Sequence, residues 1–121
     1  MSATLRIPFA DCLPATWLAA RLAVEPAKID GRRRAGELIA VRKAGSTEWL
    51  YPAWQFEAWE PRRGVARIVA AAREAGVDET RLYDLLTMPL GLTGRRRLVD
   101  LLHEGREDEV VAAVRAPRAL M

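Results

Sequence analysis

The spacing of proline and glycine between residues 14 and 36 limits the fold of this chain more than any other feature. Pro14 and Pro26 each suit the first turn of a helix, where the N–H group that proline lacks is not needed. Gly36 ends the second helix, and Val24 lies where the chain must turn between the two. The sequence therefore predicts two short helices joined by a tight turn.

The side chains of this predicted pair point to one inward and one outward surface. The apolar face of the first helix consists of Trp17, Leu18 and Leu22. In the second helix Ile29 is the inward anchor, and Lys28 and Arg32 lie four residues apart on an outward face. Gly31 costs about 1 kcal/mol relative to alanine inside a helix, and Arg33 takes a place where an apolar side chain is expected. The second helix is therefore expected to be short, irregular, or ordered only on DNA.

A β-hairpin is predicted directly after the helix pair. Residues 38–41 are apolar and partly β-branched, residues 48–51 form the returning strand, and residues 44–47 make a four-residue loop that contains glycine. Tyr51-Pro52 stops the second strand. The tip carries Arg42 and Lys43 on one side and Ser46 and Thr47 on the other. Basic and hydroxyl side chains are those needed to lie against a phosphate backbone.

Proline, glycine and charge without any apolar residue mark residues 60–64 as the domain boundary. Residues 1–60 and 61–121 are therefore predicted to be two domains, the second built from helices alone. The first of these helices ends at Gly76, and the second runs from its cap Asp78 to Met88-Pro89. A loop follows at residues 90–94. The third helix runs from about Leu98 to Gly105, and the last spans residues 107–115. The fold class is mainly α with a small β-hairpin.

Two stretches of the first half allow more than one interpretation. Leu5, Ile7 and Phe9 alternate with other residues, which suits either a short strand or an extended arm. Trp54, Phe56 and Trp59 form an aromatic cluster, for which core packing is favoured over the stacking of nucleic-acid bases.

The positive charge is concentrated in the first half. Residues 1–64 hold ten Lys or Arg against seven Asp or Glu, whereas residues 65–121 hold nine of each. Residues 28–43 alone carry a net charge of +4, a local electrostatic footprint suited to phosphate. Residues 95–97 are a second basic run, open to interpretation as solvated charge, a second phosphate contact or a partner surface.

Several classes of function are disfavoured by composition. Cys12 is the only cysteine and His103 the only histidine, which excludes an internal disulfide and a Cys/His zinc site. His103 lies at an apparent helix end, where interaction with the helix dipole explains it better than catalysis does. No pair of acidic residues is marked as a general acid and base. We therefore expect no enzyme activity, no metal and no cofactor.

No stretch is long and apolar enough for a transmembrane helix, and residues 1–11 lack the features of a signal peptide. The protein is therefore expected in the cytoplasm, associated with the nucleoid.

The first half resembles the winged helix-turn-helix of excisionase and MerR-type DNA-binding domains. In that pattern a leucine-glycine-valine turn precedes the recognition helix, glycine-x-leucine opens the wing, and isoleucine- or tyrosine-proline closes it. The matching residues here are Leu22-Ala23-Val24, Gly36-Glu37-Leu38 and Tyr51-Pro52. The resemblance implies a DNA-reading head whose second helix enters the major groove.

The second half, residues 64–116, resembles the helical C-terminal domain of ParS/MbcA-type antitoxins. It is also similar to the corresponding part of small actinobacterial winged-helix DNA-binding proteins, which share this order of domains. The residues that carry the resemblance are Leu85-Leu86-Thr87-Met88-Pro89, Leu92-Thr93-Gly94-Arg95 and Val99-Asp100-Leu101-Leu102-His103-Glu104-Gly105. This resemblance implies a role for the second half in dimerisation or partner binding.

Together these observations lead to one leading hypothesis and one alternative. The leading hypothesis is a DNA-binding transcription regulator that binds double-stranded DNA, as a homodimer formed through the helical half. The expected DNA contacts are Lys28, Arg32, Arg33, Arg34, Arg42, Lys43, Ser46 and Thr47. The alternative is an antitoxin-like subunit that binds a toxin, or another protein, through its C-terminal helices. No membrane partner is expected.

Overall fold

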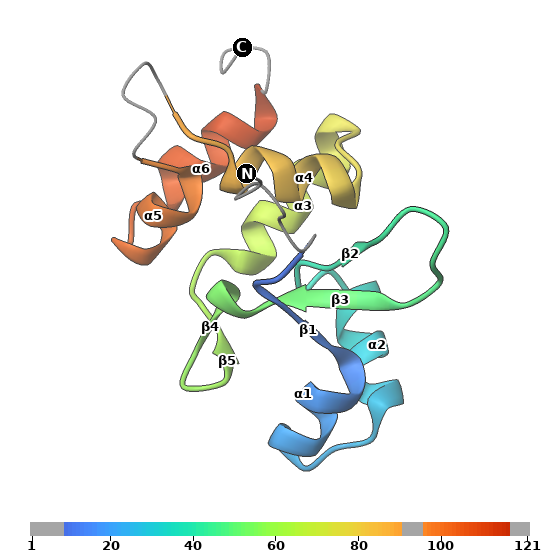
Figure 1. Ribbon diagram of the computed structural model, residues 1–121. Helices are drawn as coiled ribbons and strands as arrows, with labels where there is room; N and C mark the ends of the chain where they lie inside the picture. The colour runs from blue at the N-terminus through green and yellow to red at the C-terminus, as the bar shows by residue number, and fades with distance from the viewer. Residues whose placement is uncertain (1–8, 91–95, 117–121) are drawn as a thin grey trace, which may run out of the picture.

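The computed structural model describes residues 9–90 and 96–116 and is mainly α-helical with two small antiparallel sheets (Figure 1). The helices are α1 (Ala15–Leu22), α2 (Pro26–Arg34), α3 (Val65–Ala75), α4 (Glu79–Thr87), α5 (Leu98–His103) and α6 (Glu107–Arg115), with a 3-10 turn η1 (Ala53–Gln55). The strands are β1 (Cys12–Pro14), β2 (Val41–Arg42), β3 (Trp49–Pro52), β4 (Phe56–Glu57) and β5 (Glu60–Pro61). Within the described residues, no helix has the length and apolar character needed to cross a membrane.

Helices α1 and α2 form the predicted pair. Leu18 and Ile29 are fully buried between them, and Ala23 turns the chain in the left-handed conformation, with φ of 57°. Gly31 does not interrupt α2, and Asp30 adds ion pairs to Arg33 and Arg34 of the same helix. Of the predicted alternatives, the helix is short, with nine residues, and it is not irregular.

The outward side of α1 also differs from prediction. Trp17 was expected on the inward face, but 43% of it is exposed, and its ring lies 5.1 Å from that of Trp59. Leu18 and Leu22 do point inward. With Leu18 directed at the core, its neighbour Trp17 is about 100° away around the helix, so both cannot face inward equally.

The hairpin is shorter than predicted and its loop is longer. Strand β3 pairs with β2 on one side and with β1 on the other, and the β2 register places Val41 opposite Leu50 and Arg42 opposite Trp49. The loop therefore spans residues 43–48. Residues 38–40 are not a strand, because the buried side chain of Gln55 takes the place of a neighbouring strand. Its Oε1 accepts from the Ile39 amide at 2.7 Å, and its Nε2 donates to the Ile39 carbonyl at 2.8 Å.

Two short strands were not expected from the sequence. Strand β1 covers residues 12–14, whereas the predicted strand or arm at residues 5–9 lies outside the described residues except for Phe9. Strands β4 and β5 pair in the stretch that was predicted to run into an irregular linker. Ala58 and Trp59 connect them with φ of 52° and 64°, the mirror-image turn that suits the twist of a hairpin.

The helical half agrees closely with prediction. Helix α3 ends at Gly76 in the left-handed conformation, and the Asp78 side chain caps α4 by accepting from the Arg81 amide at 2.8 Å. Helix α4 stops before Met88, and α6 spans the expected residues 107–115. The predicted loop at residues 90–94 lies outside the described residues, apart from Leu90, which pairs with Arg96.

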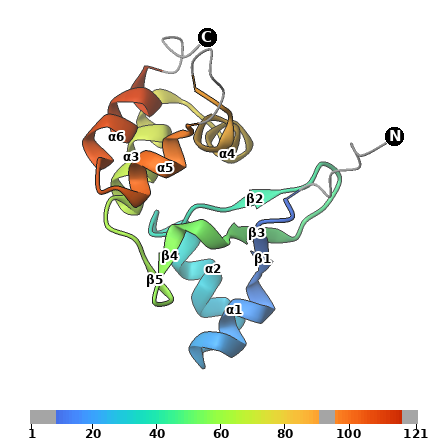
Figure 2. The same cartoon turned by 60° about the vertical axis from the view of Figure 1, so that its left-hand side comes forward.

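Two apolar cores lie on opposite sides of the three-stranded sheet. Figure 2 shows the sheet between the α1–α2 pair and helices α3 to α6. The first core joins α1 and α2 to the sheet, and the second joins the four later helices. Residues 38–40 supply both, since Leu38 and Ala40 enter the first core and Ile39 enters the second. The predicted aromatic cluster is divided in the same way: Phe56 packs in the first core and Trp54 against the second.

Polar contacts also connect the two halves. Asp11 accepts from the Tyr83 hydroxyl at 2.5 Å and from the Trp54 indole at 2.9 Å. The Trp54 carbonyl lies 2.9 Å from His103 Nε2 and accepts from Arg62 Nε at 3.1 Å. His103 therefore contacts the chain between the halves, which the sequence alone did not indicate.

Candidate nucleic-acid interface

Helix α2 presents three of the predicted DNA contacts to solvent to different degrees. Lys28 is exposed, and 73% of the Arg34 side chain is exposed although it pairs with Asp30 at 2.9 Å. The Arg32 side chain is 23% exposed, and its Nε lies 3.2 Å from Glu37 Oε1. Lys28 is thus free to meet a ligand, whereas Arg34 must first leave Asp30 and Arg32 must first leave Glu37.

Arg33 points in the other direction. Its side chain is 16% exposed, pairs with Asp30, and places its guanidinium 4.1 Å from the centre of the Trp49 ring. The hydrogen bond from Arg33 lowers the pKa of the Asp30 carboxyl, and burial raises the pKa of the neighbouring Tyr51. An apolar side chain was expected four residues after Ile29. Arg33 can occupy this position because its guanidinium packs over the Trp49 ring. This geometry suits support of α2 better than a direct contact with DNA.

The loop of residues 43–48 carries Lys43, Ser46 and Thr47, and Arg42 lies directly before it on β2. The Ser46 amide donates to the Lys43 carbonyl at 3.0 Å across a turn in which Gly45 has φ of 82°. The Ser46 hydroxyl accepts from the Glu48 amide at 3.0 Å, so its own hydrogen is free to donate. Lys43 and Thr47 are exposed. The loop therefore offers one ammonium group and two hydroxyl groups to solvent.

Trp49 connects this loop to α2. Arg42 is directly opposite Trp49 in the sheet, and its guanidinium lies 4.5 Å from the ring centre. Since Arg33 lies over the same ring, one tryptophan contacts a basic residue from each of the two elements. Cation–π contacts of this kind contribute about 0.5–2 kcal/mol each. From the sequence, Trp49 was expected only as a strand residue.

The loop also borders the helical half. A polar hollow of about 290 Å³ lies between the loop and the start of α4, lined by Lys43, Ser46, Trp49, Glu79 and Thr80 among others. Glu79 brings a negative charge to this hollow, which makes it a poor phosphate site by itself. The hollow therefore does not extend the basic surface of the loop.

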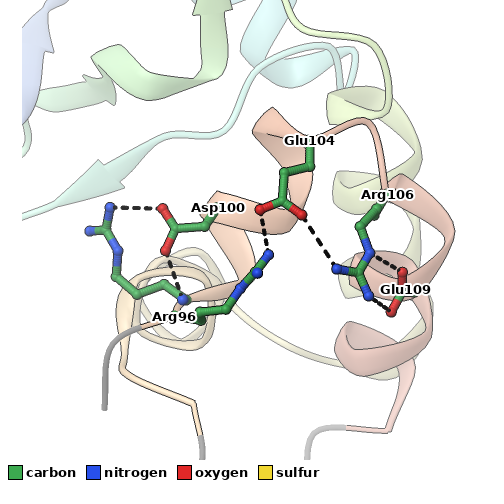
Figure 3. Close-up of polar contacts among 6 residues, drawn as sticks. Arg96, Asp100, Glu104, Arg106 and Glu109 are labelled. Carbon is green, nitrogen blue, oxygen red and sulfur yellow. Dashed lines mark hydrogen bonds and ion pairs between the residues drawn. The ribbon is translucent and has the colours of Figure 1, made fainter. Parts of the chain in front are cut away.

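The predicted contacts differ in how far their charge is neutralised, since Arg32, Arg33 and Arg34 of α2 each pair with an acidic side chain. Lys28, Arg42 and Lys43 make no ion pair with any residue that the structure describes. In contrast, Arg96 pairs with Glu104, which also pairs with Arg106 at 3.3 Å (Figure 3). These contacts favour the solvated-charge interpretation of residues 96 and 97, and Arg95 lies outside the described residues.

The Arg97 side chain lies 3.5 Å from Asp100, and the Asp100 carboxylate accepts from the Arg97 amide at 2.9 Å, which caps α5. The structure thus assigns Arg97 and Asp100 a part in starting this helix.

Outside these surfaces, the described residues also include acidic side chains and the one cysteine of the chain. They contain no group of three or more His, Cys, Asp or Glu side chains placed to hold a metal ion. Cys12 is half-buried, and burial followed by the nearby Asp11 charge raises its pKa to about 12. A thiol in this state is protonated near neutral pH and is a weak nucleophile.

The chain is similar to one solved protein structure that bears on its fold. An NMR structure of Rv2175c matches with a TM-score of 0.75 and 24% sequence identity, over 93% of this chain and 84% of that chain. At this identity the likeness supports the arrangement of helices and strands. No protein-family model and no curated protein sequence matches the chain.

Proposed function

We propose that this protein is a DNA-binding transcription regulator and that its first half is a winged helix-turn-helix. In this proposal α1 and α2 are the helix-turn-helix, α2 is the recognition helix, and the loop of residues 43–48 is the wing. The observation that carries the proposal is the pair of adjoining basic surfaces, on α2 and on the loop, joined through Trp49.

Each basic residue has a distinct part in the proposed complex. Lys28 and Arg34 are exposed on α2 and are assigned to bases and phosphates in the major groove. Arg32 joins them after exchanging Glu37 for a phosphate, since both partners are anions. Arg33 supports the helix through Asp30 and Trp49 and does not read a base.

The wing is assigned to the phosphate backbone. Arg42 and Lys43 supply charge, and the hydroxyl groups of Ser46 and Thr47 donate to phosphate oxygens. Such contacts fix the position of a protein on the duplex without reading its sequence. Sequence preference therefore comes from α2 in this proposal, and salt dependence comes from both elements.

A homodimer belongs to the same proposal, because one small reading head covers few base pairs. The sequence suggested the helical half as the contact, but the largest exposed apolar side chains in the described residues are Trp17 and Val24, at 43% and 37% exposure. These two side chains, on α1 and in the turn after it, give a second candidate contact beside the helical half. Light scattering at micromolar concentration tests this, since Trp17→Ser should yield a monomer if the contact is right.

The proposal is tested by fluorescence anisotropy with the DNA upstream of the protein's own gene and with a scrambled duplex, each at low and physiological salt. We expect tight, salt-sensitive binding that prefers the native duplex. Equal binding to both duplexes would indicate an architectural role. Absence of binding at either salt would refute DNA recognition and favour the antitoxin-like, protein-binding alternative.

Variants make the test specific to the proposed surfaces. Lys43→Ala should weaken binding to both duplexes and reduce the slope of log K against log salt by about one unit, as loss of one phosphate contact requires. Arg115→Ala is the matched control, because Arg115 is exposed on α6 and pairs only with Glu74 among the described residues. An equal effect of both variants would show that net charge, rather than the wing, determines affinity.

A further inference from the structure

Arg73 reaches from the helical half to the end of the proposed recognition helix. It lies on α3, and its guanidinium donates to the carbonyl of Arg33 at 3.2 Å and to that of Arg34 at 3.4 Å. The neighbouring residues of α3, Val69 and Ala72, are buried in the second core. The packing of α3 therefore holds the backbone of Arg73 in place, while its guanidinium contacts the end of α2.

The carbonyl groups at the end of a helix need hydrogen-bond donors from outside the helix. The last carbonyl groups of a helix have no amide partner within it, and a cation there interacts favourably with the helix dipole. The Arg33 carbonyl also accepts from the Gly36 amide, whereas Arg73 is the partner found for the Arg34 carbonyl among the described residues. Arg73 makes no ion pair with any carboxylate that the structure describes. Its charge is thus directed at α2.

The Arg73 guanidinium lies close against the turn that follows α2. Gly36 has φ of 81°, a conformation that favours glycine, and a Cβ atom at this position would lie 3.0 Å from Arg73 Nη1. A small apolar cavity of about 40 Å³ lies beside the contact, lined in part by Arg33, Leu38 and Arg73. Apolar packing therefore leaves a gap at this joint, and the two hydrogen bonds from Arg73 provide a directional restraint across it.

We propose that Arg73 is a positioning residue through which the helical half controls the recognition helix. This inference rests on the proposed DNA-binding function. Arg73 holds the end of α2 in the orientation that presents Lys28 and Arg34 to DNA. Loss of this contact would release the end of α2 and lower the affinity for DNA, so the helical half supports DNA binding without contacting DNA.

Salt-dependent DNA binding distinguishes positioning from direct contact. Arg73→Ala should weaken binding by about three- to tenfold at every salt concentration and leave the salt slope unchanged, as expected for loss of a helix-end cation. Arg73→Lys should recover part of the affinity, since ammonium can also donate to these carbonyls. Arg115→Ala should behave as the wild type. A slope smaller by about one unit would identify Arg73 as a phosphate contact, and unchanged affinity would also overturn the inference.

Amide hydrogen exchange of the free protein tests the same contact without DNA. The amides of Ala35, Gly36 and Glu37 close the end of α2 on the carbonyls of residues 31–33. In Arg73→Ala these amides should exchange about three- to tenfold faster, while amides in α4 and α6 should not change. Unaltered exchange would overturn the inference. If the wild type fails to bind DNA, the proposed function is wrong, and the exchange result still decides whether Arg73 restrains α2.

Discussion

Replacement of Gln55 by leucine should be among the most damaging single changes in this protein. Gln55 is fully buried, the one buried polar side chain in the part of the chain that the structure describes. Its amide makes three hydrogen bonds, two with Ile39 at 2.7 and 2.8 Å and one with the Pro52 carbonyl at 3.1 Å. Leucine fills a similar volume but makes none of them.

The expected loss follows from the backbone groups left without partners. A buried donor or acceptor that loses its partner costs about 1–3 kcal/mol. The Ile39 amide and carbonyl and the Pro52 carbonyl are all affected, and the apolar leucine offsets part of the cost by removing the burial of an amide. The net loss should be about 3 kcal/mol, which is large for a single substitution. For a chain of this size it lowers Tm on the order of 10 °C.

Urea unfolding followed by tryptophan fluorescence measures this loss. Glu57→Leu is the control, because Glu57 is exposed on the adjacent strand and should change stability by less than about 0.5 kcal/mol. A loss below about 1 kcal/mol in Gln55→Leu would refute the view that this side chain replaces a strand partner.

The variant Gln55→Glu provides a second test. A buried carboxylate facing two carbonyl groups has a raised pKa, so its protonated form is favoured in the folded state. Stability that depends on such a proton is present at low pH and lost as pH rises through the folded pKa. The loss in free energy of unfolding relative to wild type should therefore become smaller as the solution is made more acidic. A defect independent of pH would show that the carboxyl does not occupy the amide's place.

Three further predictions concern separate parts of the molecule. Trp49→Leu removes both guanidinium contacts and should lower the free energy of unfolding by about 1–2 kcal/mol in urea and weaken DNA binding; full retention of affinity would mean that α2 and the wing act independently. Asp78→Ala should cost about 1 kcal/mol through loss of the α4 cap, whereas the exposed Thr80→Ala should cost little. The hydrogen bond from Arg96 lowers the pKa of Glu104 below its usual 4.5, so the stability it contributes is present above pH 4.5 and lost as pH falls through the folded pKa. Glu104→Gln should remove this part of the acid dependence in unfolding curves, and identical curves for both proteins would refute it.

Local signals predicted much of the fold. Pro26, Gly36, Gly76 and Asp78 lie at helix ends where the structure also begins or ends a helix. Capping and proline effects act over one turn of chain, so they are readable from neighbouring residues. The β4–β5 hairpin was missed, because Ala58 and Trp59 at its turn are not residues that usually favour positive φ.

The candidate site was predicted only in part. The basic residues of α2 and of the loop were recognised as a group, and most of them are exposed. The direction of Arg33 was not predictable from its helix, since helical periodicity specifies a face and not the aromatic ring across from it. The contact of Arg73 with α2 had no sequence signal, because it joins residues 40 positions apart.

By itself, therefore, the sequence determined the order and ends of the helices, the basic character of residues 28–43 and the apolar stripes of the helical half. The tertiary structure decided which of the basic side chains face solvent, that Gln55 serves residues 38–40 as a strand partner, and that α3 holds the end of α2. The physical reason is the distance along the sequence between the residues that interact. Helix caps and periodic burial depend on residues within a few positions, whereas these contacts arise only when segments 16 to 40 residues apart are brought together by two cores on one sheet.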